Sequence, residues 1–323
     1  MTEQFPGAPQ PQDSIESGDP TVVWARGRGC AFLATLIGGD RAHKADGDLR
    51  TACIQARADL LIARGHSSFD LIDVAVPHHV VPEHISSVVA AVAGGPHSSL
   101  AARIAGALAS GMGVPGRIVI ASSTVEDDVA AQAVLDGLPS NSFMLSREVV
   151  RSATASTLVE SFPSGTLLVL GAPGGSWMQR QFFGPGRKLL YSASGGAVVV
   201  RSAPRRCFQV AGPASVLGTH MRVGDAEFII DGRRVVPVAE AGRLVGIVRE
   251  TALLDSSPDA TIGDVMEAPV FVHVDDLVED SVQVARFLDW GDVPVIDRGG
   301  ALFGVIGQQP GSVIDEGSNE SKH

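Results

Sequence analysis

Short apolar runs alternate with amphipathic stretches through the middle of the chain. Five runs have the length of buried β-strands: residues 71–76, 117–121, 141–145, 166–170 and 196–200. Apolar residues recur at helical spacing in five other stretches: residues 83–93, 99–111, 125–135, 152–162 and 178–191. Strands separated by helices indicate right-handed crossovers. We therefore expect residues 69–206 to be an α/β domain, a five-stranded parallel sheet with helices on both faces.

The pattern is less regular on either side of this region. An apolar segment at residues 21–37 is interrupted by Arg-Gly-Arg-Gly at residues 26–29, and residues 48–64 have helical spacing. We expect residues 21–68 to be an extension of mixed α/β structure whose fold the pattern does not specify. The two ends, residues 1–20 and 310–323, are polar, and we expect both to be disordered tails.

An internal repeat follows the α/β region. The segment RRVVPVAEAGRLVGIV at residues 233–248 resembles WGDVPVIDRGGALFGVI at residues 290–306. Pro237 aligns with Pro294 and Gly246 with Gly304, at offsets of 57 and 58 residues. Each copy has the pattern of a strand, a glycine-containing turn and a second strand. Two copies predict a pseudo-symmetric pair that shares one core.

The composition favours an aliphatic core in a reducing compartment. Apolar residues make up 45% of the 323 residues and aromatic residues only 5%, which suits helices packed on a Val- and Ile-rich sheet. The three cysteines, Cys30, Cys53 and Cys207, have no paired spacing. This excludes a zinc ribbon and a disulfide framework and is typical of a cytoplasmic protein.

Charge and hydropathy argue against two classes of partner. The net charge of −11 disfavours a general nucleic-acid binder, which needs a basic face. No run approaches the about 18 consecutive apolar residues of a membrane span. The amino terminus also lacks the basic and apolar regions of a secretory signal. We expect neither nucleic acid nor a membrane as a partner.

A glycine-rich stretch directly follows the apolar run at residues 166–170. Its sequence is GAPGGSWMQRQFFGPG, with Gly171 and Gly174 at the strand end and Gly184 before a helical stretch. Backbone N–H groups at such a turn can hold phosphate oxygens, and glycine lets a ligand approach because it has no Cβ. Arg187 could add a charge-assisted contact. The alternative is a tight strand-to-helix connection that binds nothing.

The spacing G-x2-G-x9-G of these glycines resembles a motif of the universal stress protein family. The resemblance covers about residues 71–204 and implies that Gly171, Gly174 and Gly184 hold the triphosphate of ATP. The Ser or Thr that ends the family motif is replaced by Pro185. The family's acidic residue after strand one is replaced by His78 or His79, so we expect His79 to line the cleft and contact an anionic ligand.

The repeat at residues 207–309 resembles a tandem pair of cystathionine-β-synthase (CBS) domains, on the segments VVPVAEAGRLVGIV and ALFGVI. The resemblance implies a cleft for adenine nucleotides or S-adenosylmethionine, held by the motif G-h-x-(S/T)-x-x-D. The hydroxyl and Asp positions hold Arg249 and Ala252 in the first copy, and Gly307 and Pro310 in the second. The alternative for this pair is a dimerisation platform without a ligand.

Other patterns carry weaker signals. The segment GMGVPG at residues 111–116 matches G-x-G-x-x-G but follows a helix and precedes a strand, the reverse of a dinucleotide-binding loop. The histidines near residues 78–97 lack metal-ligand spacing, so no metal is expected. No nucleophile elbow of the G-x-S-x-G type is present. We do not expect an enzyme, although weak ATPase activity stays open.

Together these patterns predict a cytoplasmic, stress-associated regulatory protein. We expect it to sense ATP or another adenine nucleotide, to form a homodimer and to modulate an unidentified protein partner. The alternative is a degenerate scaffold that dimerises and binds a partner without a nucleotide. Pro185 and the absent aspartates favour this alternative.

Overall fold

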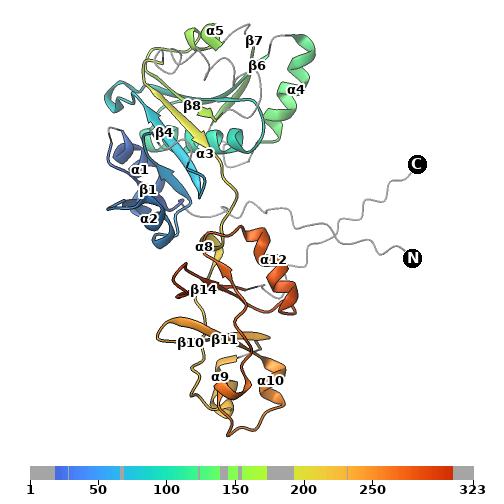
Figure 1. Cartoon of the computed structure of the whole chain (residues 1–323). Helices are drawn as coiled ribbons and strands as arrows, with labels where there is room; N and C mark the ends of the chain where they lie inside the picture. The colour runs from blue at the N-terminus through green and yellow to red at the C-terminus, as the bar shows by residue number, and fades with distance from the viewer. Residues whose placement is uncertain are drawn as a thin grey trace, which may run out of the picture. The chain divides into compact units, whose positions relative to one another are not determined.

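The computed structural model describes residues 19–27, 29–65, 69–122, 124–138, 145–151, 155–172, 193–230 and 232–307. These residues belong to two compact units (Figure 1), which we call the N-terminal unit, residues 19–204, and the C-terminal unit, residues 205–307. Within the described part of the chain, no helix has the length and hydropathy needed to cross a membrane.

One nine-stranded sheet forms the centre of the N-terminal unit. Its strands are β1 (Val22–Trp24), β2 (Ala42–Lys44), β3 (Leu60–Ile62), β4 (Asp73–His78), β5 (Ser87–Val92), β6 (Gly116–Ser122), β7 (Ser146–Arg151), β8 (Thr166–Gly171) and β9 (Ala197–Arg201). Their order is β2-β1-β3-β4-β9-β8-β5-β6-β7. Every neighbouring pair is parallel except β4 and β9, which are antiparallel.

The antiparallel pair divides the sheet into two parallel parts with the same winding. In the larger part the chain runs from β5 to β6 and β7, then returns to the other side of β5 through β8 and β9. In the smaller part it runs from β1 to β2, then returns to the other side of β1 through β3 and β4. The sheet therefore has two points at which the direction of winding reverses, one beside β5 and one beside β1.

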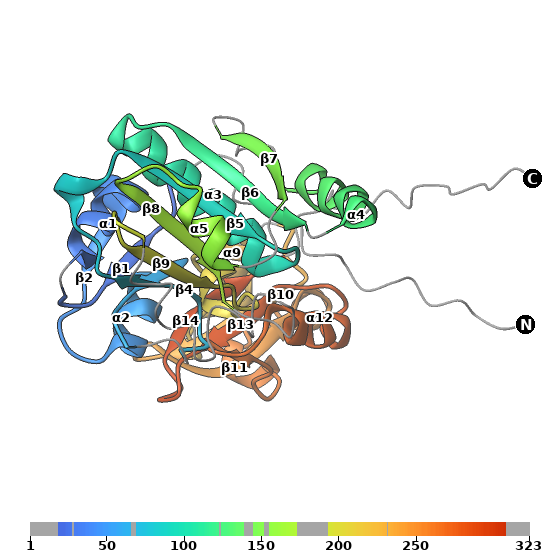
Figure 2. The same ribbon diagram turned by 90° about the horizontal axis from the view of Figure 1, so that it is seen from above.

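Helices cover both faces of this sheet. They are α1 (Cys30–Gly38), α2 (Leu49–Gln55), α3 (Pro96–Met112), α4 (Val125–Asp136) and α5 (Ala155–Glu160), with short 3-10 turns η1 (Gly39–Arg41) and η2 (Pro82–His84). Alternate residues of β5 face opposite cores. Val88 and Val92 pack with α1, α3 and α4, whereas Val89 and Ala91 pack with α5. Figure 2 shows α4 beside β6 and β7.

Helix α4 begins as its sequence predicts. The Thr124 hydroxyl accepts a hydrogen bond from the Asp127 amide at 3.2 Å. The Asp127 carboxylate accepts one from the Thr124 amide at 3.1 Å. This reciprocal capping satisfies two backbone donors that the first turn of a helix leaves unpaired.

The α/β class is confirmed, but the sheet differs from the predicted one. It has nine strands rather than five, because residues 21–68 contribute β1, β2 and β3 and because β5 is a strand where a helix was expected. Residues 83–93 were expected to be helical but contain η2 and β5 instead. All six residues of β5 are buried, since helices cover both faces of the sheet, and such a strand shows no alternation of polar and apolar residues. The expected helix at 178–191, and residues 141–144 of one expected strand, lie outside the described residues.

The C-terminal unit consists of short strands and helices. They are α8 (Cys207–Val210), α9 (Val223–Ile230), β10 (Val235–Glu240), β11 (Arg243–Arg249), α10 (Glu250–Leu254), α11 (Ile262–Val265), β12 (Val272–His273), α12 (Val278–Phe287), β13 (Val293–Ile296) and β14 (Leu302–Ile306). Strands β10 and β11 form one antiparallel hairpin, and β13 and β14 form a second, which β12 extends in parallel.

The internal repeat is confirmed by the pairing of the two hairpins. Val238 lies opposite Gly246, and Val295 lies opposite Gly304. The register shifts directly after Val238 and directly after Val295, so the two copies share the position of the irregularity. A Cβ on Gly246 would lie 2.8 Å from the Glu267 carbonyl oxygen, and one on Gly304 would collide with the Gly212 backbone. Both glycines let another segment of backbone cross the hairpin.

Candidate functional site

The carboxyl ends of β5 and β8 meet at the first reversal of winding, the place where parallel α/β sheets usually bind ligands. Gly171 is the last residue of β8 and lies against the first turn of α3. A Cβ at Gly171 would lie 3.0 Å from the His97 Cβ and 3.1 Å from the His97 carbonyl carbon. Glycine at this position therefore lets the strand end approach the helix closely.

On the other side of this edge, Gly94 and Gly95 connect β5 to α3. Both have positive φ angles, of 97° and 79°, which glycine adopts without strain. Among the described residues, no group accepts a hydrogen bond from either amide. A Cβ built on Gly95 would meet no atom of the described residues within 4 Å, so they leave the space beside this glycine open.

The first turn of α3 adds a favourable potential for an anion. The helix has 17 residues, its N-cap is Gly95 without a side-chain cap, and its first turn contains no acidic residue. Aligned peptide dipoles place partial positive charge at this end of the helix. The unpaired amides and the helix dipole together can bind phosphate oxygens.

A half-buried polar cluster holds this turn of α3 against the start of β4 and the end of β9. The His97 Nδ1 accepts a hydrogen bond from the Ser202 amide at 3.0 Å. The Asp73 carboxylate accepts one from the Ala203 amide at 2.9 Å and lies 3.4 Å from the Arg103 guanidinium. These contacts fix the position of the helix start relative to the sheet.

Burial shifts the pKa of both titratable groups toward the neutral form. It raises the pKa of Asp73, although the Ala203 amide and Arg103 act in the opposite direction. It lowers the pKa of His97, and the nearby Arg201 lowers it further, while Asp73 opposes the shift. A neutral His97 is the form that can accept the bond from Ser202, which agrees with the lowered pKa.

The predicted site residues do not all lie at this edge. Gly171 does, whereas Gly174, Gly184 and Arg187 lie outside the described residues. His79 is at the opposite edge, because β4 is antiparallel to β9. A Cβ built on Gly196, the residue just before β9, would lie 2.6 Å from the His79 carbonyl oxygen. Gly171 lies beside the other end of β9, roughly 13 Å farther along the strand. The expectation that His79 lines the cleft is therefore wrong.

Sequence reasoning missed Gly94 and Gly95 because it placed a helix over β5. The first of the five parallel strands in the larger part is β5, so the residue after strand one is Ala93 rather than His78 or His79. No carboxylate stands at that position. The Gly-Gly-Pro sequence at residues 94–96, directly before a helical pattern, was the available signal of a helix start.

In the C-terminal unit, the protein's own side chains occupy the first copy of the predicted nucleotide motif, G-h-x-(S/T)-x-x-D. Arg249 stands at the hydroxyl position, and its Nε donates to both Glu267 carboxylate oxygens, at 3.0 and 3.2 Å. Its Nη1 donates to Asp289 at 3.1 Å, and its guanidinium lies 5.9 Å from the centre of the Phe287 ring. The side chain is only 20% exposed. Arg249 thus links the first copy of the repeat to the end of α12 in the second.

The second copy of the motif is built differently. A Cβ on Gly307 would lie 3.0 Å from Asp292 Oδ1. Asp292 accepts a hydrogen bond from the Arg233 guanidinium at 2.8 Å. Pro310 lies outside the described residues. In the described residues of both units, no three His, Cys, Asp or Glu side chains are grouped so that they could hold a metal ion.

No protein-family model matches the sequence, and neither does any curated protein. Solved structures that resemble part of the chain are CBS-domain proteins. The cytosolic domain of the Mg²⁺ channel MgtE in complex with ATP is 20% identical, over 32% of this chain and 45% of that one, with a TM-score of 0.30. The CBS domains of a transcriptional regulator from Streptococcus pneumoniae are 24% identical, over 31% of this chain and 89% of that one, with a TM-score of 0.29.

A third similar structure is CBSX2 from Arabidopsis thaliana, a CBS-pair protein, in complex with AMP. It is 21% identical, over 32% of this chain and 90% of that one, with a TM-score of 0.29. The chain spans less than half the length of the MgtE domain, and each of these likenesses is confined to about a third of this chain.

Proposed function

We propose that this protein is a regulatory sensor that binds the phosphates of an adenine nucleotide at the carboxyl ends of β5 and β8. The observation that carries the proposal is the pair of unpaired amides of Gly94 and Gly95, which precede a long helix at a reversal of winding. Gly171 faces the same helix turn from β8. Nucleotide binding there would favour one conformation of the unit and so modulate a protein partner.

The winding of the larger part of the sheet supports a universal-stress-like domain. Its five strands have the order β7-β6-β5-β8-β9 and are mutually parallel. This is a doubly wound arrangement, which leaves the strand ends beside β5 open to a ligand. The G-x2-G-x9-G spacing begins at Gly171, the residue that ends β8 at this same edge.

The proposed site holds phosphates better than it holds a nucleoside. Ala93 supplies no carboxylate for the ribose hydroxyls, and one charge-assisted hydrogen bond of this kind is worth about 1.5–3 kcal/mol. Helix dipole and amides both favour greater negative charge on the ligand. We therefore expect ATP to bind more tightly than ADP, and ADP more tightly than AMP.

Thermal unfolding of the full chain with each nucleotide tests the proposal. At tenfold excess over the Kd, we expect ATP to raise the unfolding temperature of the N-terminal unit by about 3–6 °C. Gly95→Asp places a carboxylate in the open space at the helix start and should abolish the shift. Gly95→Asn strains the backbone to a similar degree without adding charge, and it should retain most of the shift.

A matched control lies at the other end of the same helix. Gly113, the C-cap of α3, also has a positive φ, of 65°, and no atom within 4 Å of a built Cβ. Gly113→Asp should leave the ATP-dependent shift intact. Equal shifts in Gly95→Asp and the wild type, or no shift with any adenine nucleotide, would contradict the sensor function.

A second candidate function is favoured by the Arg249 contacts. Arg249 occupies the hydroxyl position of the nucleotide motif and is held by Glu267 and Asp289. We propose that the C-terminal unit is a CBS-like pair that binds no nucleotide and serves in dimerisation or partner binding. Titration calorimetry of the Gly95→Asp chain, which lacks the proposed site of the N-terminal unit, with AMP and ATP tests it, and saturable binding would contradict it.

We propose no catalytic step for this protein. A regulatory role fits the geometry, because the edge formed by β5 and β8 brings together amides and a helix start rather than a nucleophile and a base. If the wild type released phosphate from ATP and the Gly95→Asp variant did not, the ATPase alternative would be revived. A homodimer in the cytoplasm remains part of the proposal, and sedimentation of the purified chain tests the dimer.

A further inference from the structure

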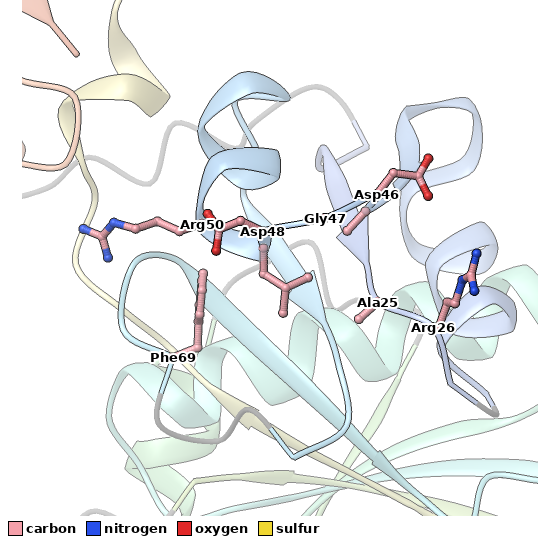
Figure 3. A pocket seen from close by; sticks show the side chains of 9 residues that line it. Ala25, Arg26, Asp46, Gly47, Asp48, Arg50 and Phe69 are labelled. Atoms are coloured by element: carbon pink, nitrogen blue, oxygen red, sulfur yellow. The ribbon is translucent and has the colours of Figure 1, made fainter. Parts of the chain in front are cut away.

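An open pocket of about 710 Å³ lies at the second reversal of winding, in the smaller part of the sheet. It is formed where the chain leaves β1 and β2, and Phe69 closes it from the connection between β3 and β4 (Figure 3). The backbone there is fixed by ladder bonds. The Ala25 amide donates to the Ile62 carbonyl at 3.0 Å, and the Ala45 amide donates to the Trp24 carbonyl at 2.9 Å.

Four charged residues line the pocket: Arg26 and Arg50, and Asp46 and Asp48. Arg26 lines the pocket directly after β1. Arg64 follows β3, and its alkyl chain lies beside Gly27, where a Cβ would come within 3.3 Å of the Arg64 Cδ. In the part of the chain that the structure describes, neither guanidinium forms an ion pair with a carboxylate. Arg26 lines the pocket, and Arg64 lies outside the lining, just past the end of the neighbouring strand; both cations favour an anionic ligand.

The two carboxylates of the pocket already have partners. Asp48 accepts hydrogen bonds from the Thr51 amide at 2.8 Å and from the Thr51 hydroxyl at 2.7 Å, so it caps α2. Asp46 lies 3.9 Å from the Lys44 ammonium. These contacts reduce the repulsion that the carboxylates would exert on a bound anion.

Apart from Arg50 and Gly47, the rest of the lining is apolar. Ala25, Ala45, Leu49 and Phe69 form this surface. Figure 3 shows Arg26 and Asp46 toward one end of the pocket, and Arg50 and Phe69 toward the other. The lining thus combines charged groups with apolar surface, which suits a ligand that carries an anionic group on an apolar or aromatic body.

We propose that this pocket binds a phosphate monoester with an apolar or aromatic body. Arg26 and Arg64 bind the phosphate, because the guanidinium group matches its oxygens, and Leu49 and Phe69 contact the body of the ligand. The site is separate from the Gly94–Gly95 edge of the larger part, so the chain would carry two phosphate sites, one at each reversal of winding.

Phenyl phosphate is a suitable probe, with inorganic phosphate and benzyl alcohol as controls for its anionic and its aromatic part. Titration of the full chain, followed by phosphorus NMR of the probe, should give saturable binding. Inorganic phosphate should bind more weakly, and benzyl alcohol should not compete at equal concentration. Arg26→Gln and Arg64→Gln should each weaken phenyl phosphate binding by about tenfold, because each removes one charge-assisted contact.

Arg151→Gln is the matched control, since Arg151 is an exposed arginine of the same sheet that pairs with Asp128 at 2.7 Å. It should bind the probe as the wild type does. Equal weakening in all three variants would show a non-specific charge effect and overturn the proposal, as would no binding to the wild type.

The two phosphate sites are distinguished by Gly95→Asp. This variant should lose the ATP-dependent shift and keep phenyl phosphate binding, whereas Arg26→Gln should do the reverse. Loss of phenyl phosphate binding in Gly95→Asp would place the probe at the first site and overturn the second. Failure of ATP to bind the wild type would contradict the sensor function but leave this pocket untouched.

Discussion

The Nδ1 atom of His97 accepts a hydrogen bond from the backbone amide of Ser202 at 3.0 Å. This bond joins the first turn of α3 to the residue that follows β9, and it requires an unprotonated Nδ1. The start of the helix that we propose as a phosphate site is therefore held in place by a group that titrates.

The stability of the N-terminal unit should fall as the pH falls below neutrality. Folding lowers the pKa of His97 below its usual value, so the unfolded chain binds more protons in that range. The stabilisation is thus present above about pH 6.5, the unfolded pKa, and is lost as the pH falls through the lowered pKa. Urea unfolding at pH 7.5, 6.5 and 5.5 measures this change.

His97→Gln should flatten this dependence, because its side-chain oxygen can accept the bond but does not titrate. Asp73 has a raised pKa, so its contribution has the opposite sign and appears at lower pH. Because the Asp73 carboxylate opposes the lowering of the His97 pKa, the loss of stability below pH 6.5 should be at least as large in Asp73→Asn as in the wild type. Equal pH dependence in the wild type and His97→Gln would refute the role assigned to His97.

Gly171→Ala should destabilise the N-terminal unit. The new Cβ would lie 3.0–3.2 Å from side-chain and backbone atoms of His97, which cannot move without displacing α3. Overpacking of this kind costs about 1–3 kcal/mol. Gly106→Ala in the middle of α3 is the control, because its nearest neighbour is 3.9 Å away. It should stabilise the unit by about 0.5–1 kcal/mol. Denaturant unfolding measures both variants, and equal stability of Gly171→Ala and the wild type would contradict the prediction.

Leu33→Ala should destabilise the whole N-terminal unit, not only its amino-terminal strands. Leu33 is fully buried on α1, in the same core as α3 and β6. Truncation of a buried Leu costs about 2–5 kcal/mol. Hydrogen exchange should speed up in β6 as well as in β1 if the sheet unfolds as one cooperative unit. Faster exchange confined to residues 22–62 would show two independent units instead.

The double variant Arg249→Thr with Ala252→Asp should give the C-terminal unit affinity for AMP. It restores the hydroxyl and the carboxylate that the nucleotide motif requires, and it removes the guanidinium that Glu267 and Asp289 hold. With Gly95→Asp added to remove the proposed site of the N-terminal unit, titration calorimetry should detect binding by the double variant but not by Arg249→Thr alone. If neither variant binds AMP, the missing motif residues are not what prevents nucleotide binding by this unit.

Much of the architecture could be predicted from local pattern. The strand that ends at Gly171, the cap at Thr124 and the repeat with Pro237 and Pro294 follow from periodicity, side-chain chemistry and spacing. The strand β5 could not be predicted in this way, because a strand buried on both faces lacks alternation and its apolar run also fits a helix. Because of this error, the predicted strand one was β4 instead of β5. The site was therefore expected at His79, whereas the glycines that follow β5 are Gly94 and Gly95.

The sequence by itself determined an α/β chain with an internal repeat, and it located Gly171 at the end of a strand. These are local properties, set by which residues neighbour each other along the chain. Only the tertiary structure decided that β1, β2 and β3 join the same sheet and that β4 runs antiparallel to β9. Strands pair in the arrangement that buries their apolar faces together, and this arrangement depends on contacts between residues far apart in the chain. The same arrangement set His79 and Gly171 at opposite edges of the sheet.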